Sequence, residues 1–334
     1  MLLPPLLMNF LIIRLSSLGD IILTQPVVAE LQDRYPGCGI TYVCKPEYVA
    51  LVRMMDPAIK ILPFGETLSF FAQLRKDRYD AVLDLHGKLA STLILLGTKA
   101  KKRFRYDKQR SLRQAIVAHR SDQSINSTVQ LYYSALDRLT GIAPDSFKRP
   151  QLRLPDISLA PERMPKGIPG KRLIGIFPGA AHLTKMYPEQ QWREFFQIAD
   201  ADWSFVLLGS LKESRIADRL MTALPDRIEN RCGSYSFEEL ALVMSQCDLI
   251  ISADSGPMHL AAALNLPQIA IFGSTHPRLG FAPQNPKAIV LCADLPCQPC
   301  TLHGQDYCPL GHFECMKKIS PGMLKDKVVK VLGV

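Results

Sequence analysis

Two short turns, one near each end of the chain, each join an apolar run to a helical pattern. The first turn is Arg14–Asp20 (RLSSLGD), which directly follows the apolar run Phe10–Ile13. The second is Asp254–His259 (DSGPMH), which directly follows Leu249–Ile251 near the other end of the sequence. In open α/β sheets, ligands bind at the carboxyl ends of the strands, where turns of this kind lie. Two such turns so far apart predict two lobes, an arrangement that suits an enzyme joining two substrates.

The length of the chain also predicts two domains. At 334 residues it exceeds one ordinary hydrophobic core, and it fits two domains of about 150 residues each. With 47% hydrophobic and 21% charged residues, both domains can bury a core, and no segment has the composition of disorder. The formal charge of +9 indicates an acidic ligand, an anionic membrane surface or nucleic acid, or nothing beyond solubility.

The first half alternates between runs typical of buried parallel strands and helical patterns. The predicted strands are Phe10–Ile13, Ile40–Cys44, Ala81–Leu85 and a weaker one at Ile59–Leu62. The predicted helices are Ile21–Arg34, Pro46–Met55 and Asn126–Thr140, the last ended by Gly141. This alternation predicts a doubly wound, Rossmann-like α/β domain over residues 1–155.

The pattern restarts in the second half, after a stretch rich in proline and glycine that we expect to be a linker over residues 156–170. Strands are predicted at Leu173–Phe177, Ser204–Leu208, Leu249–Ser252 and Gln268–Phe272. Helices are predicted at Pro188–Ala199, Glu213–Leu224, Ser236–Ser245 and Pro257–Leu264. We therefore expect a second Rossmann-like domain over residues 171–320, and a final helix at 321–334 that packs back on the first domain.

The N-terminal stretch Met1–Leu7 is apolar, but it lacks the basic region and the small-residue cleavage site of a secretory signal. Translation can start at Met1 or at Met8, since the first predicted strand follows at once. No window offers the roughly 20 apolar residues that a membrane span needs. We expect a cytoplasmic protein whose nine cysteines are reduced thiols.

The first turn offers a carboxylate at the mouth of a binding crevice. Ser17 and Gly19 lie where backbone N–H groups and a close approach serve a ligand, and Asp20 can accept a proton from a sugar hydroxyl. The alternative is that Asp20 only caps the helix Ile21–Arg34, because Asp is a favoured N-cap residue. Position alone does not separate the two interpretations.

Two further turns of the second half place charged residues beside a helix start. Thr184 and Lys185 come just before a helix that a proline initiates, where an anion is favoured. Lys185 can then bind a diphosphate, or it is a solvated loop lysine. After Gly209, Glu213 can accept hydrogen bonds from ribose hydroxyls, or it only stabilises the helix dipole.

The turn Asp254–His259 is the strongest of these signals. Asp254, Ser255 and Gly256 precede a proline-initiated helix, so several backbone N–H groups are aimed at one point. His259 lies on the first turn of that helix and can reach the same ligand. The alternative is a structural histidine whose ring bonds to the loop backbone.

Positive charge is concentrated in residues 99–113, where eight lysines and arginines accompany a single acidic residue, Asp107. A solvated basic face is the usual explanation of such a run. Because the rest of the chain is nearly balanced, we favour an anionic acceptor or a membrane surface, with Lys101, Arg103 and Arg105 as acceptor-side candidates. Nucleic acid is disfavoured because no nucleic-acid-binding motif accompanies the run.

Four cysteines near the C-terminus, Cys297, Cys300, Cys308 and Cys315, form the pattern C-x2-C-x7-C-x6-C. Four thiolates in one loop can hold a structural Zn²⁺. The second pair lacks the tight spacing of most zinc motifs, and two histidines in the same stretch compete as ligands. The segment therefore indicates either a structural zinc site or a metal-free loop, and it suggests no catalytic metal.

Together these segments resemble glycosyltransferase family 9, the lipopolysaccharide heptosyltransferase family. The resemblance is carried by Ile12–Thr24, Asp84–Gly87, Pro178–Ala180, Lys185–Glu189 and Asp254–Ala263. It implies a GT-B fold, in which two Rossmann-like domains face each other across a cleft, the first binding the acceptor and the second the nucleotide sugar. It also implies inverting transfer from ADP-heptose to an inner-core sugar of lipopolysaccharide, without a required cofactor or metal.

The resemblance further implies roles for individual residues. By position, Asp20 matches the family's catalytic base, and Thr184 and Lys185 match its diphosphate ligands. Glu213 matches its ribose-contacting acid. The donor-binding turn of the family is matched by Asp254, Ser255, Gly256 and His259. The implied partners are a nucleotide-sugar donor and an anionic, lipid-linked saccharide acceptor. Such an acceptor would make the chain peripheral on the cytoplasmic face of the inner membrane.

Two other functions remain compatible with the motifs. A GT-B nucleotide-sugar epimerase shares the fold but needs no acceptor groove, and the basic segment and the early Gly-Asp turn argue against it. A non-catalytic nucleotide-sugar-binding protein is disfavoured because a candidate base and candidate phosphate ligands are all present. The residues alone do not distinguish ADP from UDP or GDP, and they leave the acceptor position and the oligomeric state open.

Overall fold

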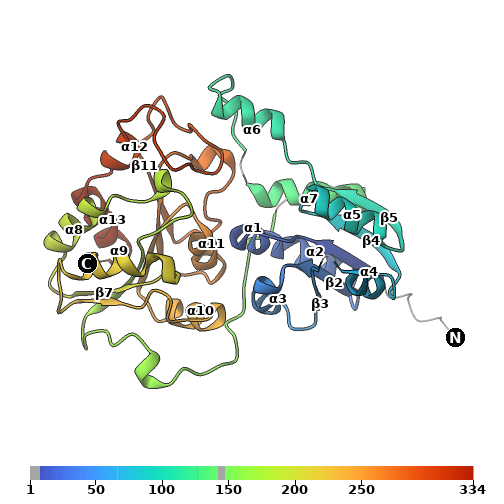
Figure 1. The fold of residues 1–334 in the computed structure, drawn as a ribbon, viewed down its shortest axis with the longest axis horizontal. Helices are drawn as coiled ribbons and strands as arrows, with labels where there is room; N and C mark the ends of the chain where they lie inside the picture. The colour runs from blue at the N-terminus through green and yellow to red at the C-terminus, as the bar shows by residue number, and fades with distance from the viewer. Residues whose placement is uncertain (1–7, 66, 126, 142–146, 334) are drawn as a thin grey trace. The chain divides into compact units, whose positions relative to one another are not determined.

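The computed structural model describes residues 8–65, 67–125, 127–141 and 147–333. It divides into two compact units, each built on one parallel sheet (Figure 1). The first unit comprises Met1–Gln109 and Ser127–Arg153, and the second comprises Arg110–Asn126 and Leu154–Val334. The stretch Met1–Leu7, for which we expected no signal function, lies outside the described residues.

The first unit holds a five-stranded parallel sheet in the order β3-β2-β1-β4-β5. Its strands are β1 (Asn9–Ile13), β2 (Gly39–Cys44), β3 (Lys60–Pro63), β4 (Tyr79–Asp84) and β5 (Ala100–Arg105). Its helices are α1 (Leu18–Ile22), α2 (Gln25–Arg34), α3 (Val49–Met55), α4 (Leu68–Leu74), α5 (Leu89–Gly97) and α7 (Thr128–Thr140), with a 3-10 turn η1 (Pro46–Tyr48). Phe10–Ile13 of β1 are fully buried, because the central strand of a doubly wound sheet is covered on both faces.

The second unit holds a six-stranded parallel sheet in the order β11-β10-β9-β6-β7-β8. Its strands are β6 (Arg172–Phe177), β7 (Trp203–Leu207), β8 (Ile228–Asn230), β9 (Leu249–Ala253), β10 (Gln268–Phe272) and β11 (Ala288–Cys292). Its α-helices are α6 (Arg110–Val117), α8 (Glu189–Ile198), α9 (Ser214–Met221), α10 (Phe237–Ser245), α11 (Gly256–Ala263), α12 (Glu314–Lys317) and α13 (Pro321–Leu332). Its 3-10 turns are η2 (Pro161–Arg163), η3 (Leu183–Lys185), η4 (Leu211–Glu213) and η5 (Pro277–Leu279).

Every strand predicted from the sequence forms, within two residues of its predicted bounds. The helix that ends at Thr140 is also confirmed, and Gly141 follows it in the left-handed conformation, with its N–H donating to the Asp137 carbonyl at 2.7 Å. The helix predicted over Ile21–Arg34 is instead two helices. The amide and the hydroxyl of Thr24 both donate to the Ile21 carbonyl and so end the first helix, and Pro26, which has no N–H, starts the second.

Residues 110–126 depart from the expected division into continuous domains. We expected them in the first domain, over residues 1–155, but they pack with the second unit. Arg113 of α6 donates to the Leu279 carbonyl at 3.3 Å, and its guanidinium lies 4.7 Å from the centre of the Phe281 ring. Ile125 N–H donates to the Arg278 carbonyl at 2.8 Å. These contacts attach the segment to the 278–281 stretch of the second unit.

The ends of the second unit also differ from expectation. The final helix, expected to pack on the first domain, packs against α8, β9 and β10, and its buried Leu324 and Val328 belong to the core of the second unit. The proline-rich stretch expected as a linker lies along the second unit. Within it, Arg163 donates to the Ser234 carbonyl at 2.7 Å, and Tyr235 donates to the Arg163 carbonyl at 2.7 Å.

Candidate active site

In the first unit, the turn after β1 places Asp20 in the first turn of α1. Ser17 is the N-cap residue of that helix, and Asp20 is the third residue within it. Asp20 Oδ2 accepts hydrogen bonds from the Ser17 hydroxyl at 2.8 Å and from the Ser17 N–H at 3.3 Å, as in a capping box. Asp20 is therefore not the N-cap residue, the position that the alternative interpretation gave it. Gly19, beside it, is buried within the helix.

An arginine from the end of β1 holds the Asp20 carboxylate. Arg14 Nη2 lies 2.6 Å from Asp20 Oδ2. The rest of its guanidinium is bound to backbone, with Nε donating to the Ser16 carbonyl at 2.7 Å and Nη1 to the Leu85 carbonyl at 2.6 Å. Arg14 is buried and gives three of its five N–H donors to these groups. It therefore supports Asp20 from within the protein.

These contacts keep Asp20 ionised. Burial acts to raise the pKa of the carboxyl, but the charge of Arg14 and the hydrogen bonds from Ser17 and Tyr132 outweigh it, and the pKa of Asp20 lies well below its usual range. Oδ1 accepts a single hydrogen bond among the described residues, from the Tyr132 hydroxyl at 3.1 Å. A carboxylate oxygen has room for a second donor. Asp20 can thus accept a hydrogen bond, and then a proton, from a substrate hydroxyl.

His86 lies at the same carboxyl edge of the sheet as Asp20, and no role was predicted for it from the sequence. It follows β4, whose Asp84 pairs in register with Ile13 of β1, so the two loops are neighbours. Burial, together with the charges of Arg14 and Lys88, lowers the pKa of His86 to about 4, so the ring is neutral at pH 7. Its Nδ1 is buried and makes no hydrogen bond within the described part of the chain. A chemistry-bearing residue after the strand next to β1 was the signal that could have identified it.

The basic candidates of the first unit are not gathered in one place. Arg105 ends β5 and forms an ion pair with the buried Asp84 at 2.7 Å, so it reaches the carboxyl edge of the sheet. Lys101 lies near the other end of the strand and pairs with Asp80 at 2.7 Å. Arg103 donates to the carbonyls of Leu95, Ala100 and Thr98, and so caps the end of α5. Of the three basic residues, only Arg105 lies at the carboxyl edge of the sheet, where Asp84 ends β4.

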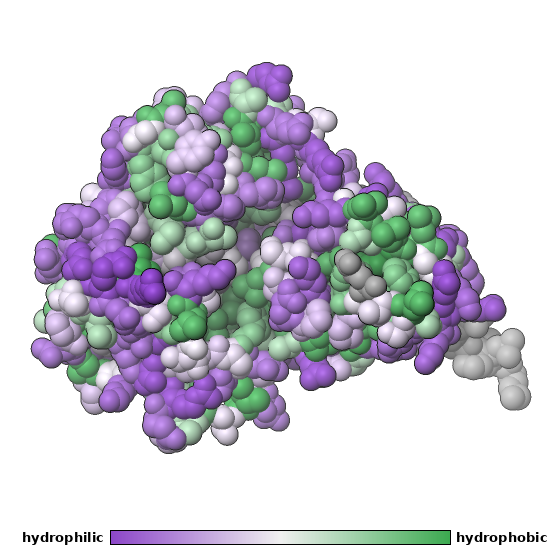
Figure 2. All heavy atoms as spheres, viewed as in Figure 1, coloured by the Kyte–Doolittle hydropathy of each residue, from purple (hydrophilic) through white to green (hydrophobic). Residues whose placement is uncertain are grey.

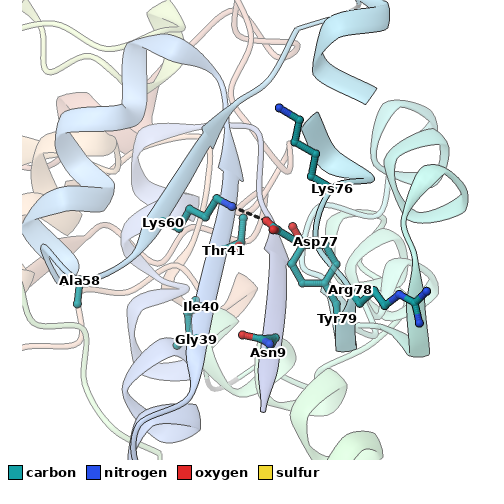
Figure 3. Close-up of a pocket in the computed structure, with 10 residues that line it drawn as sticks. All are labelled: Asn9, Gly39, Ile40, Thr41, Ala58, Lys60, Lys76, Asp77, Arg78 and Tyr79. Carbon is teal, nitrogen blue, oxygen red and sulfur yellow. Dashed lines mark hydrogen bonds and ion pairs between the residues drawn. The ribbon is translucent and has the colours of Figure 1, made fainter. Parts of the chain in front are cut away.

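A cavity of about 430 Å³ lies at the opposite edge of this sheet, where the strands begin (Figure 3). Its lining includes Asn9, Gly39, Lys60 and Tyr79, the first residues of β1 to β4. Figure 3 shows Lys60 pointing toward Asp77, with which it forms an ion pair, and Arg78 pointing away. Ligands of open α/β sheets bind at the carboxyl edge, so this cavity is not the expected substrate site.

In the second unit, Thr184 and Lys185 lie in η3, after the end of β6. The Thr184 hydroxyl donates to the Gln305 carbonyl at 2.8 Å and accepts from Gln305 N–H at 2.9 Å and from the Ser274 hydroxyl at 2.8 Å. One donated and two accepted bonds exhaust a hydroxyl. Thr184, expected as a diphosphate ligand, thus has a side chain that anchors the loop and offers nothing further to a ligand.

Lys185 lies beside the turn after β9. Its Nζ lies 2.9 Å from Oδ2 of Asp254, which also accepts a hydrogen bond from the Thr275 hydroxyl at 2.8 Å. Asp254 is buried, so it orients Lys185 and does not itself face a ligand. An ammonium has three donors, and one of them is committed to Asp254. Lys185 can therefore place a cation on a phosphate.

The N-terminus of α11 completes this group. Ser255 is the N-cap residue, but its hydroxyl donates to the Ala253 carbonyl at 3.2 Å and does not cap the helix. Gly256 begins the helix, and the buried His259 lies in its first turn. Backbone N–H groups at the start of a helix favour an anion, and no side chain of the N-cap residue occupies them here.

Glu213 ends η4, the 3-10 turn that follows β7, and it lies beside the loop that follows β6. Its Oε2 accepts hydrogen bonds from the Ser210 N–H at 2.7 Å and the Ser210 hydroxyl at 2.6 Å. A side chain at Gly179 would collide with Glu213, since a Cβ there would lie 2.2 Å from its Cγ. The glycine therefore makes room for the carboxylate. Oε1 accepts no hydrogen bond within the described residues, so it remains able to accept from a ribose hydroxyl.

The cysteine loop braces the donor-side loop. Besides the Thr184–Gln305 bonds, Gly304 lies so close to Lys185 that a Cβ there would sit 2.8 Å from Lys185 Cδ. The four cysteines are not in disulfides. Burial raises the pKa of the Cys315 thiol to about 12, with a further contribution from the thiols of Cys300, Cys308 and Cys297. Within the described ranges, however, no three of them lie within 4.8 Å of one another.

A second group of metal-ligating side chains lies by a cavity of about 290 Å³ in this unit. His276, Cys292 and Asp294 bring their ligand atoms within 4.8 Å of one another. His276 Nδ1 accepts the backbone N–H of Arg278 at 3.1 Å, so the ring proton is on Nε2, which lies 2.8 Å from Asp294. A metal on Nε2 would need the proton on Nδ1 instead. The geometry therefore favours a hydrogen-bonded His276–Asp294 pair over a metal site.

Comparison with known proteins points to one family. A sequence model of "Glycosyltransferase family 9 (heptosyltransferase)" matches residues 67–309. Lipopolysaccharide heptosyltransferase 1 of Pseudomonas aeruginosa is 29% identical over 321 residues, which cover 88% of this chain and 86% of that protein.

Solved structures agree on the fold. The Escherichia coli ADP-heptose lipopolysaccharide heptosyltransferase II has a TM-score of 0.75 at 23% identity, covering 97% of this chain and 98% of its own. The Escherichia coli heptosyltransferase WaaC with ADP has a TM-score of 0.72 at 19% identity, covering 97% and 100%. These likenesses confirm the expected α/β architecture of GT-B type.

Proposed function

Since the chain belongs to glycosyltransferase family 9, we propose that it transfers heptose from ADP-heptose to an inner-core sugar of lipopolysaccharide, with inversion. Membership of the family makes the chain a glycosyltransferase, as its resemblance predicted. ADP-heptose and lipopolysaccharide appear in the names of its relatives, and the residues of both units suit that chemistry. The observation that carries the proposal is the Asp20 carboxylate, held ionised by Arg14 and still able to accept a proton.

The proposed reaction divides between the two units. In the first, Asp20 takes the proton of the acceptor hydroxyl as the oxygen forms a bond to C1 of the heptose. The bond from C1 to the diphosphate oxygen breaks, and its electron pair leaves with ADP. In the second, Lys185 and the N–H groups at the start of α11 stabilise the charge that grows on that diphosphate. Glu213 accepts hydrogen bonds from the ribose hydroxyls.

The direct test is a transfer assay with the purified full chain. Incubation with ADP-heptose and an inner-core oligosaccharide acceptor should release ADP and add the mass of one heptose to the acceptor, as measured by mass spectrometry. A thermal-shift series should show stabilisation by ADP above UDP and GDP, since a ligand that binds the folded state raises its stability. Preference for UDP, with conversion of a UDP-sugar in the absence of acceptor, would replace this proposal with the epimerase.

The proposed acceptor is lipid-linked, so the enzyme would act at the cytoplasmic face of the inner membrane as a peripheral protein. No helix in the described part of the chain is long and apolar enough to cross a bilayer.

The cysteine loop is proposed to hold a structural Zn²⁺ in the purified protein. Its four cysteines lie in one loop and form no disulfide, and thiolates are preferred ligands of zinc. The metal would stiffen the segment that anchors Thr184. Metal analysis should find zinc in the wild type and none in Cys297→Ser/Cys300→Ser, and the variant should melt at a lower temperature than the wild type. A metal-free wild type that melts at the same temperature as the variant would contradict the zinc site.

A further inference from the structure

The first unit carries an apolar helix surface that no described residue covers. Leu89, Leu93 and Leu96 lie on one face of α5, and they are 78%, 54% and 72% exposed. Leu68, which begins the neighbouring α4, is 90% exposed. In Figure 2, hydrophobic residues gather over α4 and α5 on the viewed face of this unit. We call Leu68, Leu89, Leu93 and Leu96 the leucine surface.

The leucine surface is a fixed feature of two packed helices. Ile94 of α5 and Phe70 and Leu74 of α4 belong to the same buried core cluster, so the other sides of both helices are anchored. Phe71 of α4 packs against Gly97, where an added Cβ would lie 3.1 Å from the Phe71 ring. The leucines therefore face outward because the helices bury their opposite faces.

Cations border the leucine surface. Arg75 donates to the Gly97 carbonyl at 3.1 Å, and Arg103 donates to the Leu95 carbonyl at 3.1 Å, so both guanidinium groups lie at the end of α5. Lys88 precedes the helix and Lys99 follows it, and both are exposed. None of these four cations forms an ion pair with a described residue, whereas Lys101 of β5 pairs with Asp80. The border thus carries uncompensated positive charge.

We propose that the leucine surface and its cationic border dock the enzyme on a bilayer that bears anionic headgroups. Leucines exposed on helix faces can enter the boundary between headgroups and acyl chains, while lysines and arginines beside them attract anionic lipid. Neither cavity described above is lined by any of these leucines. Charge complementarity therefore favours a lipid surface over a protein partner. The proposal rests on the proposed function in one respect, the lipid-linked acceptor that makes membrane contact useful.

The test is sedimentation of the full chain with vesicles. Wild type should bind vesicles made of equal parts phosphatidylcholine and phosphatidylglycerol, and bind vesicles of phosphatidylcholine alone much more weakly. Leu93→Ser/Leu96→Ser should lower the partition coefficient about tenfold or more, because two side chains no longer leave water. The matched control is Leu154→Ser/Leu310→Ser, which removes leucines that are 47% and 62% exposed elsewhere, and it should bind within about twofold of wild type.

The charges supply a second, independent variant. Lys88→Gln/Lys99→Gln should reduce the preference for phosphatidylglycerol severalfold, while Lys317→Gln/Lys318→Gln, which removes two exposed lysines of the second unit, should leave it unchanged. Circular dichroism on each variant checks that the fold is kept. Wild type that ignores the anionic vesicles, or leucine and lysine variants that bind like wild type, would overturn the docking proposal.

These outcomes are separate from those of the transfer assay. Vesicle binding needs neither donor nor acceptor sugar, and transfer to a lipid-free oligosaccharide needs no membrane. If wild type binds anionic vesicles but transfers no heptose, the proposed function fails and the docking surface stands. If it transfers heptose to the lipid-free acceptor and binds no vesicles, the reverse holds.

Discussion

The carboxyl edge of each sheet carries an ion pair between an aspartate and a basic residue, and the two pairs differ in which member is the more exposed. Arg14 and Asp20 meet at 2.6 Å in the first unit, and Lys185 and Asp254 meet at 2.9 Å in the second. In the first pair the Asp side chain is the more exposed member, at 26% against 8%. In the second pair the cation is the more exposed member, at 13% against 6%. One unit therefore presents a carboxylate with a buried cation behind it, and the other presents a cation with a buried carboxylate behind it.

The surroundings of each pair reinforce that difference. Arg14 gives two further donors to backbone carbonyls, whereas Asp20 keeps a place for a donor on Oδ1. Asp254 is held by Thr275, and Lys185 keeps donors beyond the one given to Asp254. A transfer between two substrates needs a proton acceptor for one and positive charge for the other. We therefore expect different losses when the exposed members are removed: the transfer rate should fall without the Asp20 carboxylate, and ADP affinity should fall without the Lys185 ammonium.

The largest expected effect follows removal of the Asp20 charge. Asp20→Asn should slow heptose transfer by roughly 10²–10⁴-fold, because the amide cannot take the proton of the acceptor hydroxyl. Steady-state measurement of ADP release with saturating donor gives the rate. Ser17→Ala is the matched control: it removes one hydrogen bond to Asp20 and keeps the carboxylate, so it should stay within about tenfold of wild type. Equal losses in the two variants would mean that Asp20 acts only through the helix cap.

Next in size is the effect of Lys185 on the donor. Lys185→Met should weaken ADP binding by roughly 10–100-fold, since one charge-assisted contact to the diphosphate is lost. Lys212→Met, an exposed lysine in η4 with no ion pair to a described residue, should bind ADP as wild type does. Titration calorimetry measures both. Unchanged affinity in Lys185→Met would remove the lysine from the donor site.

A smaller effect is expected from substitution of Thr184, and it should appear in the stability of the fold. Thr184→Val should lower the free energy of unfolding by about 1–2 kcal/mol, because Gln305 and Ser274 lose hydrogen-bond partners in a buried place. Thr184→Ser keeps the hydroxyl and should lose less. Urea unfolding compares the two. If Thr184→Val kept its stability and lost only ADP affinity, the hydroxyl would be a ligand after all.

The smallest effect concerns the pH dependence of stability. The pKa of Asp20 is lowered in the folded chain, so its stabilisation is present above the pKa of an unfolded Asp, about 3.9. It is lost as the pH falls further toward the folded value. The stability gap between wild type and Asp20→Asn should therefore be constant from pH 7 to about pH 5 and shrink below about pH 4. Asp226→Asn, at an exposed carboxylate without an ion pair to a described residue, should show no such change.

The periodic parts of the fold were predictable from the sequence because central parallel strands are apolar on both faces. Runs such as Phe10–Ile13 and Leu249–Ile251 therefore stood out. The edge strand β5 did not, since its sequence AKKRFR has the composition of a charged loop and its burial depends on tertiary context. Residues 110–126 were also missed, because no local pattern records that Arg113 and Ile125 bond to residues about 150 positions later.

The candidate site was predictable where chemistry follows directly on a strand end. Asp20, Lys185, Asp254 and Glu213 all lie at carboxyl edges, as their places after apolar runs suggested. The sequence could not say which partner of each pair is exposed, because that depends on hydrogen bonds from Tyr132 and Thr275, which come from distant segments. For the same reason the anchoring bonds of Thr184 to Gln305 were invisible, and a diphosphate ligand was expected there.

The most direct test of the division between the two units is ADP titration of Asp20→Asn and Lys185→Met side by side. If the carboxylate serves the acceptor and the lysine serves the donor, Asp20→Asn should bind ADP within about twofold of wild type, while Lys185→Met loses roughly 10–100-fold. Calorimetry on both folded variants decides it. Loss of ADP affinity in Asp20→Asn as large as that in Lys185→Met would contradict the account.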